Sequence, residues 1–189
     1  MPLTITPTSI CNSALIKLGQ EPVEDITSDT KNARLCNARY SFVRNKVLED
    51  GNWKFATKTA ELASIDTITP IMDWKNAFQL PSDFLKMLRA EDWKQEFEIL
   101  DGYLHANEDP IKIKYIYECT NTGLYSYSFA ECLSWRLAAD ISYAITQSNT
   151  VAQLMMQGYE MDLKAARFTD SHKQSPQGPI VDNWIDVRF

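Results

Sequence analysis

The sequence predicts an α+β fold that is mainly α: a helical bundle of about four helices, an inserted small antiparallel β-sheet and an extended C-terminal arm. Three observations lead to this prediction. Apolar residues recur at helical spacing on both sides of the middle of the chain, whereas the middle alternates apolar and polar residues as strands do. The last residues are apolar again, but without a period and after a stretch broken by proline and glycine.

These patterns set approximate boundaries. The helices are expected at about 6–18, 30–50, 128–148 and 150–168, with the β-rich insertion at about 60–120. We expect residues 1–170 to form a single domain and residues 171–189 to form the arm. Chain ends are normally polar and frayed unless something holds them, so an arm reading GPIVDNWIDVRF is expected either to fold back or to dock on another chain.

The composition is that of a protein with a real core. Of the 189 residues, 44% are hydrophobic and 11% are aromatic, which argues against disorder over the whole length. The formal net charge of −6 disfavours a dedicated nucleic-acid binder, which normally has a basic surface. No stretch approaches the roughly 20 apolar residues of a membrane helix, and MPLTITPTS does not read as a signal peptide. We therefore expect no membrane partner.

The first two helices have clear signals. Thr6 can cap a helix that Pro7 begins and that Gly19 ends. One apolar stripe of the second helix consists of Cys36, Tyr40, Val43 and Val47. Leu35 and Phe42 lie on a different face of that helix, among basic residues. A helix with two apolar faces touches two things, so it lies either inside a larger core or at a subunit interface, and the sequence leaves both open.

The third helix is apolar on nearly every side, which predicts that it is the central one. Its two stripes are Leu133, Leu137, Ile141 and Ile145, and Cys132, Trp135, Ala139 and Tyr143. Arg136 and Asp140 are one turn apart and can form an ion pair. The core side of the fourth helix is expected to hold Val151, Met155, Tyr159, Leu163 and Ala166.

The insertion contains a strong hairpin signal. Two extended runs, EFEIL and YLHAN, flank the pair Asp101–Gly102, which suits a two-residue turn. The run IKIKYIY alternates, with Ile111, Ile113, Tyr115 and Tyr117 on one face. The segment SDFLKML is ambiguous between a helical turn and a strand.

Few residues in the sequence indicate a reaction centre. His105 and His172 lack metal-site spacing and are expected to be solvated. The four cysteines are spread out and predict reduced, mostly buried thiols. No phosphate-binding loop or nucleophile motif is present. Carboxylate pairs such as Glu91–Asp92 and Glu108–Asp109 are conceivable acid/base couples for glycoside hydrolysis, but adjacent loop residues usually point apart. We therefore expect no catalytic residue, no metal and no cofactor.

A local charge reversal is the most distinctive chemical feature. Between residues 31 and 58 the chain carries seven basic residues and only two acids, Glu49 and Asp50. The basic residues are Lys31, Arg34, Arg39, Arg44, Lys46, Lys54 and Lys58. They form either a solvated helix face, a patch that meets an acidic surface on a neighbouring subunit, or a DNA-contacting surface.

Several segments, taken together and in order, resemble the tail tubular protein A family, the head-to-tail adaptors or gatekeepers of short-tailed bacteriophages. They are SICNSALIKLGQEPV, TKNARLCNARYSFVRNKVL, WKFA, FQLPSDFLKML and the closing NWIDVR. The resemblance runs from about residue 9 to the C-terminus, whereas residues 90–127 match only in general character.

The resemblance implies a structural protein of the virion, made in the host cytoplasm and located at the neck between capsid and tail. Its partners would be copies of itself in a twelve-subunit connector ring, the portal, and the tail nozzle (tubular protein B). Genomic DNA would pass through the lumen during ejection without specific binding. The family fold is a helical bundle with a small β insertion, as the patterns above also predict.

Ring closure requires two different buried surfaces on each subunit, which the second helix and the arm could supply. The expected subunit or portal interface consists of Leu35, Arg39, Phe42, Lys46, Ile180, Trp184, Ile185, Arg188 and Phe189. Two alternatives remain. One is a virion-associated cell-wall hydrolase using Glu91 or Glu108, and the other is a DNA-end-binding protein using the basic patch at 31–58.

Overall fold

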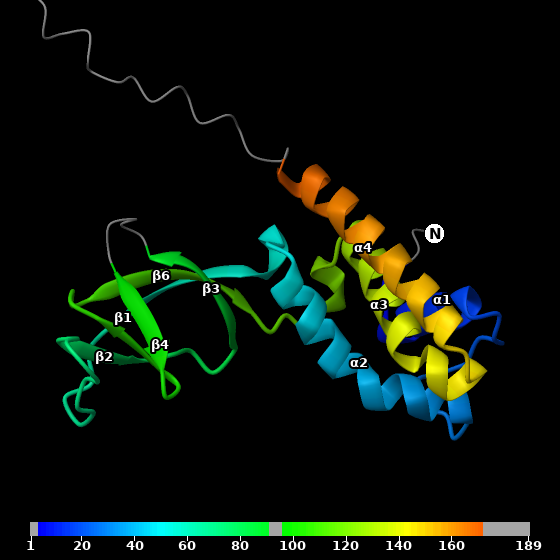
Figure 1. Ribbon diagram of the computed structural model, residues 1–189, viewed down its shortest axis with the longest axis horizontal. Coiled ribbons are helices and arrows are strands. Elements are labelled where there is room, and N and C mark those ends of the chain that lie inside the picture. Colours follow the sequence, from blue (N-terminus) through cyan, green and yellow to red (C-terminus); the bar gives the residue numbers. More distant parts are fainter. Residues whose placement is uncertain (1–3, 91–95, 172–189) are drawn as a thin grey trace, which may run out of the picture.

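The computed structural model describes residues 4–90 and 96–171. Within them, four α-helices form one end of an elongated molecule and the β-strands form the other (Figure 1). The helices are α1 (Pro7–Lys17), α2 (Lys31–Asp50), α3 (Tyr127–Thr146) and α4 (Asn149–Ser171). The predicted α+β fold, mainly α, is confirmed, and each helix boundary agrees within three residues. None of the described helices has the length and apolar character that crossing a bilayer requires.

Capping explains why the helices begin where they do. The Thr6 side chain accepts a hydrogen bond from the Ser9 backbone, Thr30 does so from Ala33, and Ser126 from Phe129. The C-terminal end of α2 is capped by a side chain that follows it in the sequence. The Trp53 indole donates to the Val47 carbonyl at 2.8 Å, and Gly51 leaves room for that ring, since a Cβ there would lie 2.2 Å from the indole nitrogen.

The β insertion contains two sheets in its described part, where the sequence predicted one. The strands are β1 (Thr57–Leu62), β2 (Asn76–Gln79), β3 (Phe84–Ala90), β4 (Phe97–Leu100), β5 (Tyr103–Ala106) and β6 (Ile111–Tyr117). They pair antiparallel in the orders β1-β6-β3 and β2-β5-β4. The single-sheet expectation is therefore wrong, because the hairpin β4–β5 pairs with β2 and not with β6.

The predicted Asp-Gly hairpin is confirmed. Asp101 and Gly102 join β4 to β5 with φ values of 54° and 82°, the left-handed conformation that a tight two-residue turn demands. The ambiguous segment around Phe84–Ala90 is a strand.

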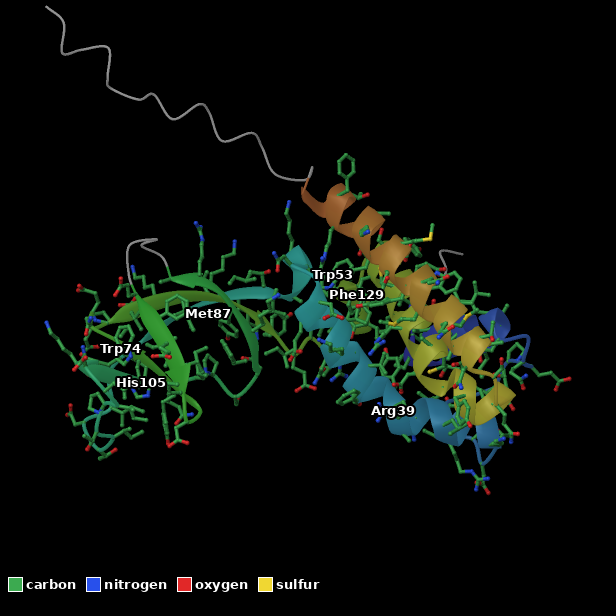
Figure 2. All side chains as sticks on the ribbon, in the orientation of Figure 1. Arg39, Trp53, Trp74, Met87, His105 and Phe129 are labelled. Carbon is green, nitrogen blue, oxygen red and sulfur yellow. The ribbon has the colours of Figure 1, made fainter. Side chains whose placement is uncertain are left out.

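Two hydrophobic clusters hold the molecule together. One fills the helical bundle, and the other lies between the two sheets around Phe78, Leu104 and Ile113. Strand β6 belongs to both, because Ile111, Ile113 and Tyr115 face the β cluster whereas Ile116 faces the helices. Near this junction, Trp53 and Phe129 pack edge to face with ring centroids 5.0 Å apart (Figure 2).

Helix α3 is central, as predicted, since it packs against α1, α2 and α4. Its first predicted stripe is buried at Leu133, Leu137 and Ile141. The second stripe is only partly correct: Cys132 is buried, but Tyr143 is exposed. The predicted Arg136–Asp140 pair does not form, because Asp140 binds Arg39 on α2 and Arg136 turns toward Met156 and Tyr159 on α4.

The predicted arm lies almost entirely outside the described residues, which end at Ser171 in α4. All four cysteines fall within the described part, and each is buried and free of disulfide bonds, as predicted.

Candidate subunit interface

Arg39 lies on the side of α2 that meets α3 (Figure 2). Its guanidinium donates two hydrogen bonds to Asp140, from Nε at 2.5 Å and from Nη2 at 3.2 Å. The hydrogen bonds and the charge of Asp140 raise the pKa of Arg39 above its ordinary value. This bidentate ion pair joins α2 to the central helix α3, so Arg39 stabilises the helical bundle.

Phe42 lies next to Arg39 and has no place in the core. Its side chain is 60% exposed, and the Arg39 guanidinium lies over its ring at 4.6 Å from the centroid. An exposed phenylalanine stacked under an arginine is typical of the anchors that protein interfaces use. Among the predicted interface residues that the structure describes, Phe42 is the most exposed apolar side chain.

The other two predicted residues of α2 are more strongly engaged within the chain. Leu35 is half-buried and packs against the helical cluster. Lys46 pairs with Asp50 at 2.8 Å, and the hydrogen bond and charge of Asp50 raise the pKa of this lysine. The second apolar face of α2 is therefore reduced to Phe42, flanked by cations with partners of their own.

The seven cations at 31–58 do not form a free basic patch. Five of them have acidic partners in the described part of the chain: Arg34 with Asp29, Arg39 with Asp140, Arg44 with Glu118, Lys46 with Asp50, and Lys58 with Asp83. Most of these acids lie far away in sequence, which is why the window seemed unbalanced. The pairs weaken the interpretation of this window as a surface for DNA or for an acidic neighbour.

Helix α4 carries an apolar row that sequence reasoning missed. Leu154, Met161 and Phe168 are 58%, 74% and 68% exposed and are spaced seven residues apart. The row lies on the face of α4 nearly opposite the buried stripe of Met155, Tyr159, Leu163 and Ala166, and it spans about 21 Å at 1.5 Å per residue. The sequence placed Met155, Tyr159, Leu163 and Ala166 on the core side correctly, but the seven-residue spacing of the three apolar residues on the other side was not recognised.

The predicted interface residues of the arm, Ile180, Trp184, Ile185, Arg188 and Phe189, lie outside the described residues. Their role stays a prediction.

Of the two histidines, only His105 lies within the described residues. His105 was expected to be solvated, and this is wrong: it is fully buried, and neither ring nitrogen has a hydrogen-bond partner among the described residues. Strand β5 is the middle strand of its sheet, and the consecutive residues Leu104, His105 and Ala106 are all buried, so both of its faces are covered. His172 lies outside the described residues.

The carboxylate pairs show no sign of an acid/base couple where they are described. Asp109 accepts hydrogen bonds from the Ser64 backbone at 3.0 Å and hydroxyl at 2.7 Å, and Glu108 is exposed. Glu91 and Asp92 lie outside the described residues. In the described ranges, no group of three or more His, Cys, Asp or Glu side chains could hold a metal ion.

No protein-family model matches the chain, and no curated protein matches it either.

Proposed function

We propose that this chain is a structural connector subunit, which assembles into a ring at the neck of a short-tailed phage and joins the portal to the tail nozzle. The ordered sequence blocks that resemble the tail tubular protein A family support this proposal. The geometry favours assembly over catalysis, because the exposed features that stand out are apolar anchors.

The observation that carries the proposal is the apolar row of α4. A single exposed leucine on a protein surface needs no explanation, but Leu154, Met161 and Phe168 repeat every seven residues on one face, as one of the two apolar positions of a helix-packing heptad does. Phe42 on α2 is a second exposed anchor. A closed ring needs two different patches on each subunit, and α2 and α4 each offer one.

Substitutions that introduce charge test whether the apolar row of α4 is a subunit interface. Leu154→Glu, Met161→Glu and Phe168→Glu together place three carboxylates where an interface would exclude water, so rings should be lost. The expected result is a monomer by analytical ultracentrifugation, and no ring in negative-stain images of the protein mixed with its portal. Because all three side chains are exposed, the melting temperature of the monomer should change little.

A matched control places three carboxylates at exposed polar positions of the β insertion, away from α2 and α4: Thr67→Glu, Thr69→Glu and Asn107→Glu. This variant should still form rings. Rings that persist in the apolar-row variant, or that are lost equally in the control, would contradict the proposal.

A further inference from the structure

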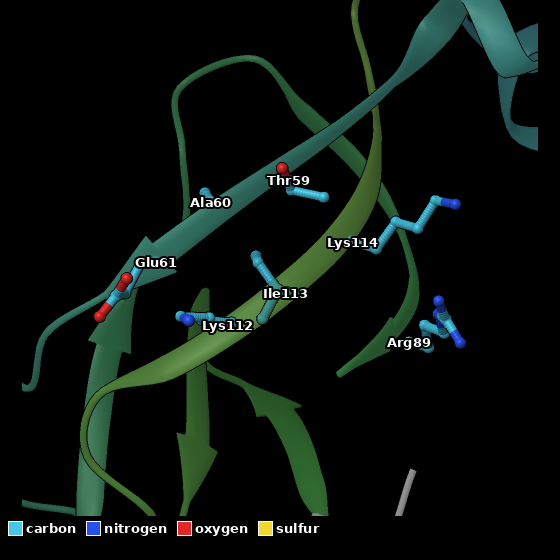
Figure 3. Close-up of a pocket in the computed structure, with 7 residues that line it drawn as sticks. All are labelled: Thr59, Ala60, Glu61, Arg89, Lys112, Ile113 and Lys114. Carbon is cyan, nitrogen blue, oxygen red and sulfur yellow. The ribbon is translucent and has the colours of Figure 1, made fainter. Parts of the chain in front are cut away.

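The outer face of the sheet β1-β6-β3 contains a hollow of about 390 Å³ with an unusual charge. Its lining includes Arg89 from β3, Lys112 and Lys114 from β6, and Thr59 and Glu61 from β1 (Figure 3). Three cations and one carboxylate leave two net positive charges, in a chain whose net charge is −6.

The centre of this hollow is a row of three residues that lie side by side across the strands. Lys114 is the register partner of both Thr59 and Arg89. Like charges placed directly opposite each other destabilise a sheet. Within the described residues, neither Arg89 nor Lys114 is paired with a carboxylate.

A β-bulge places Arg89 in this row. Between Met87 and Arg89 the strand β3 advances two residues while β6 advances one, so Arg89 and not Leu88 stands opposite Lys114. Bulges re-aim side chains in this way and are frequent beside functional sites. In Figure 3 the Arg89 and Lys114 side chains extend to the same side of the sheet, whereas Lys112 extends toward Glu61.

We propose that this hollow binds a phosphate group, carried by a nucleotide or by a nucleic-acid strand. The Arg89 guanidinium supplies the paired donors that suit phosphate oxygens, Lys114 supplies a second charge, and the Thr59 hydroxyl can donate a further hydrogen bond. Two net positive charges match a phosphate better than a single carboxylate. The volume is in the range of small-ligand sites, which is more than one phosphate fills. The hollow would bind phosphate whether or not the chain forms a ring.

Three probes test the site: inorganic phosphate, thymidine monophosphate and a fluorescent ten-nucleotide oligothymidylate. We expect the wild-type protein to bind the oligonucleotide by fluorescence anisotropy at low salt, with inorganic phosphate competing. Arg89→Gln with Lys114→Gln should weaken binding about tenfold, because two solvent-exposed charge contacts are lost. Glu61→Gln should strengthen binding several-fold, a gain that misfolding cannot produce.

The matched control removes two exposed cations elsewhere, Lys31→Gln with Lys164→Gln, and should change the affinity less than twofold. Oligonucleotide binding far tighter than that of the mononucleotide would identify a strand as the source of the phosphate, and equal binding would identify a nucleotide.

Three results would overturn the proposal. The first is that wild-type protein binds none of the probes at low salt. The second is an equal loss of binding in the control variant, which would mean non-specific attraction. The third is that an oligoglutamate peptide binds as tightly as the oligonucleotide while inorganic phosphate fails to compete.

Discussion

At the scale of single residues, the burial of His105 without hydrogen-bond partners among the described residues lowers the stability of the fold. It is fully buried in β5, opposite Ala77 and Glu98 in register, and both ring nitrogens lack a partner among the described residues. A buried polar atom without a hydrogen bond costs about 1–3 kcal/mol. His105 lies on the face of β5 opposite Leu104 and Ala106 of the β cluster, and its register neighbours there are Glu98 and the buried Ala77.

His105→Leu should therefore raise the free energy of unfolding by about 1–3 kcal/mol, measured by urea denaturation at neutral pH. His105→Gln keeps polar atoms in the same position and should bring no such gain. If the leucine variant were less stable than the wild type, the ring nitrogens would have to be satisfied, for example by a buried water.

At the scale of elements, the contact between α3 and α4 depends on a residue without a side chain. Gly158 lies in the middle of α4, where glycine costs about 1 kcal/mol relative to alanine. A Cβ at this position would lie 2.6 Å from the Trp135 ring of α3. Trp135 is itself held in place by Lys17 of α1, whose ammonium group lies 5.0 Å from the ring centroid.

Gly158→Ala should lower the free energy of unfolding by about 1–3 kcal/mol, despite the better helix propensity of alanine, because the Trp135 ring must move. Thermal or urea denaturation measures this. Gln157→Ala, one residue away and exposed, should be nearly neutral. Combining Gly158→Ala with Trp135→Leu should recover part of the loss. A more stable Gly158→Ala variant would show that the two helices do not need this close approach.

At the scale of the whole molecule, the helical and β clusters meet at β6, and the arm follows directly after α4 and its exposed apolar row. The arm carries Ile180, Trp184 and Phe189, large apolar residues of the kind that anchor interfaces. If these residues serve assembly, the folded monomer does not need them.

Deleting residues 178–189 should then abolish ring formation or portal binding and leave the melting temperature of the monomer nearly unchanged. Calorimetry and sedimentation together measure both effects. The full-length variant Ile180→Ser, Trp184→Ser and Phe189→Ser should behave in the same way. Each large apolar side chain that packs on its own domain contributes about 1.5–3 kcal/mol, so a large drop in monomer stability would mean that the arm belongs to its own core.

The four helices, the Thr6 cap and the Asp101–Gly102 turn could be predicted because each depends on residues that are neighbours along the chain. The buried stripe of α2 was predictable for the same reason. The split of the β insertion into two sheets, the burial of His105 and the pairing of Arg39 with Asp140 could not be predicted. Each depends on which segments, distant in sequence, lie side by side.

Some features of the candidate sites could likewise be predicted from the sequence, whereas others depend on the tertiary structure. Phe42 could be selected from its position opposite a buried stripe, but its exposure became clear only once α2 was packed. The basic window at 31–58 looked free in the sequence, but four of its seven cations have acidic partners from outside the window, and Lys46 pairs with Asp50 within it. The hollow around Arg89 and Lys114 has no sequence signal, because two register shifts in β3, between Phe84 and Lys86 and between Met87 and Arg89, set which residue of β6 lies opposite Arg89. Local periodicity determines which elements form, whereas strand register and packing determine which side chains meet.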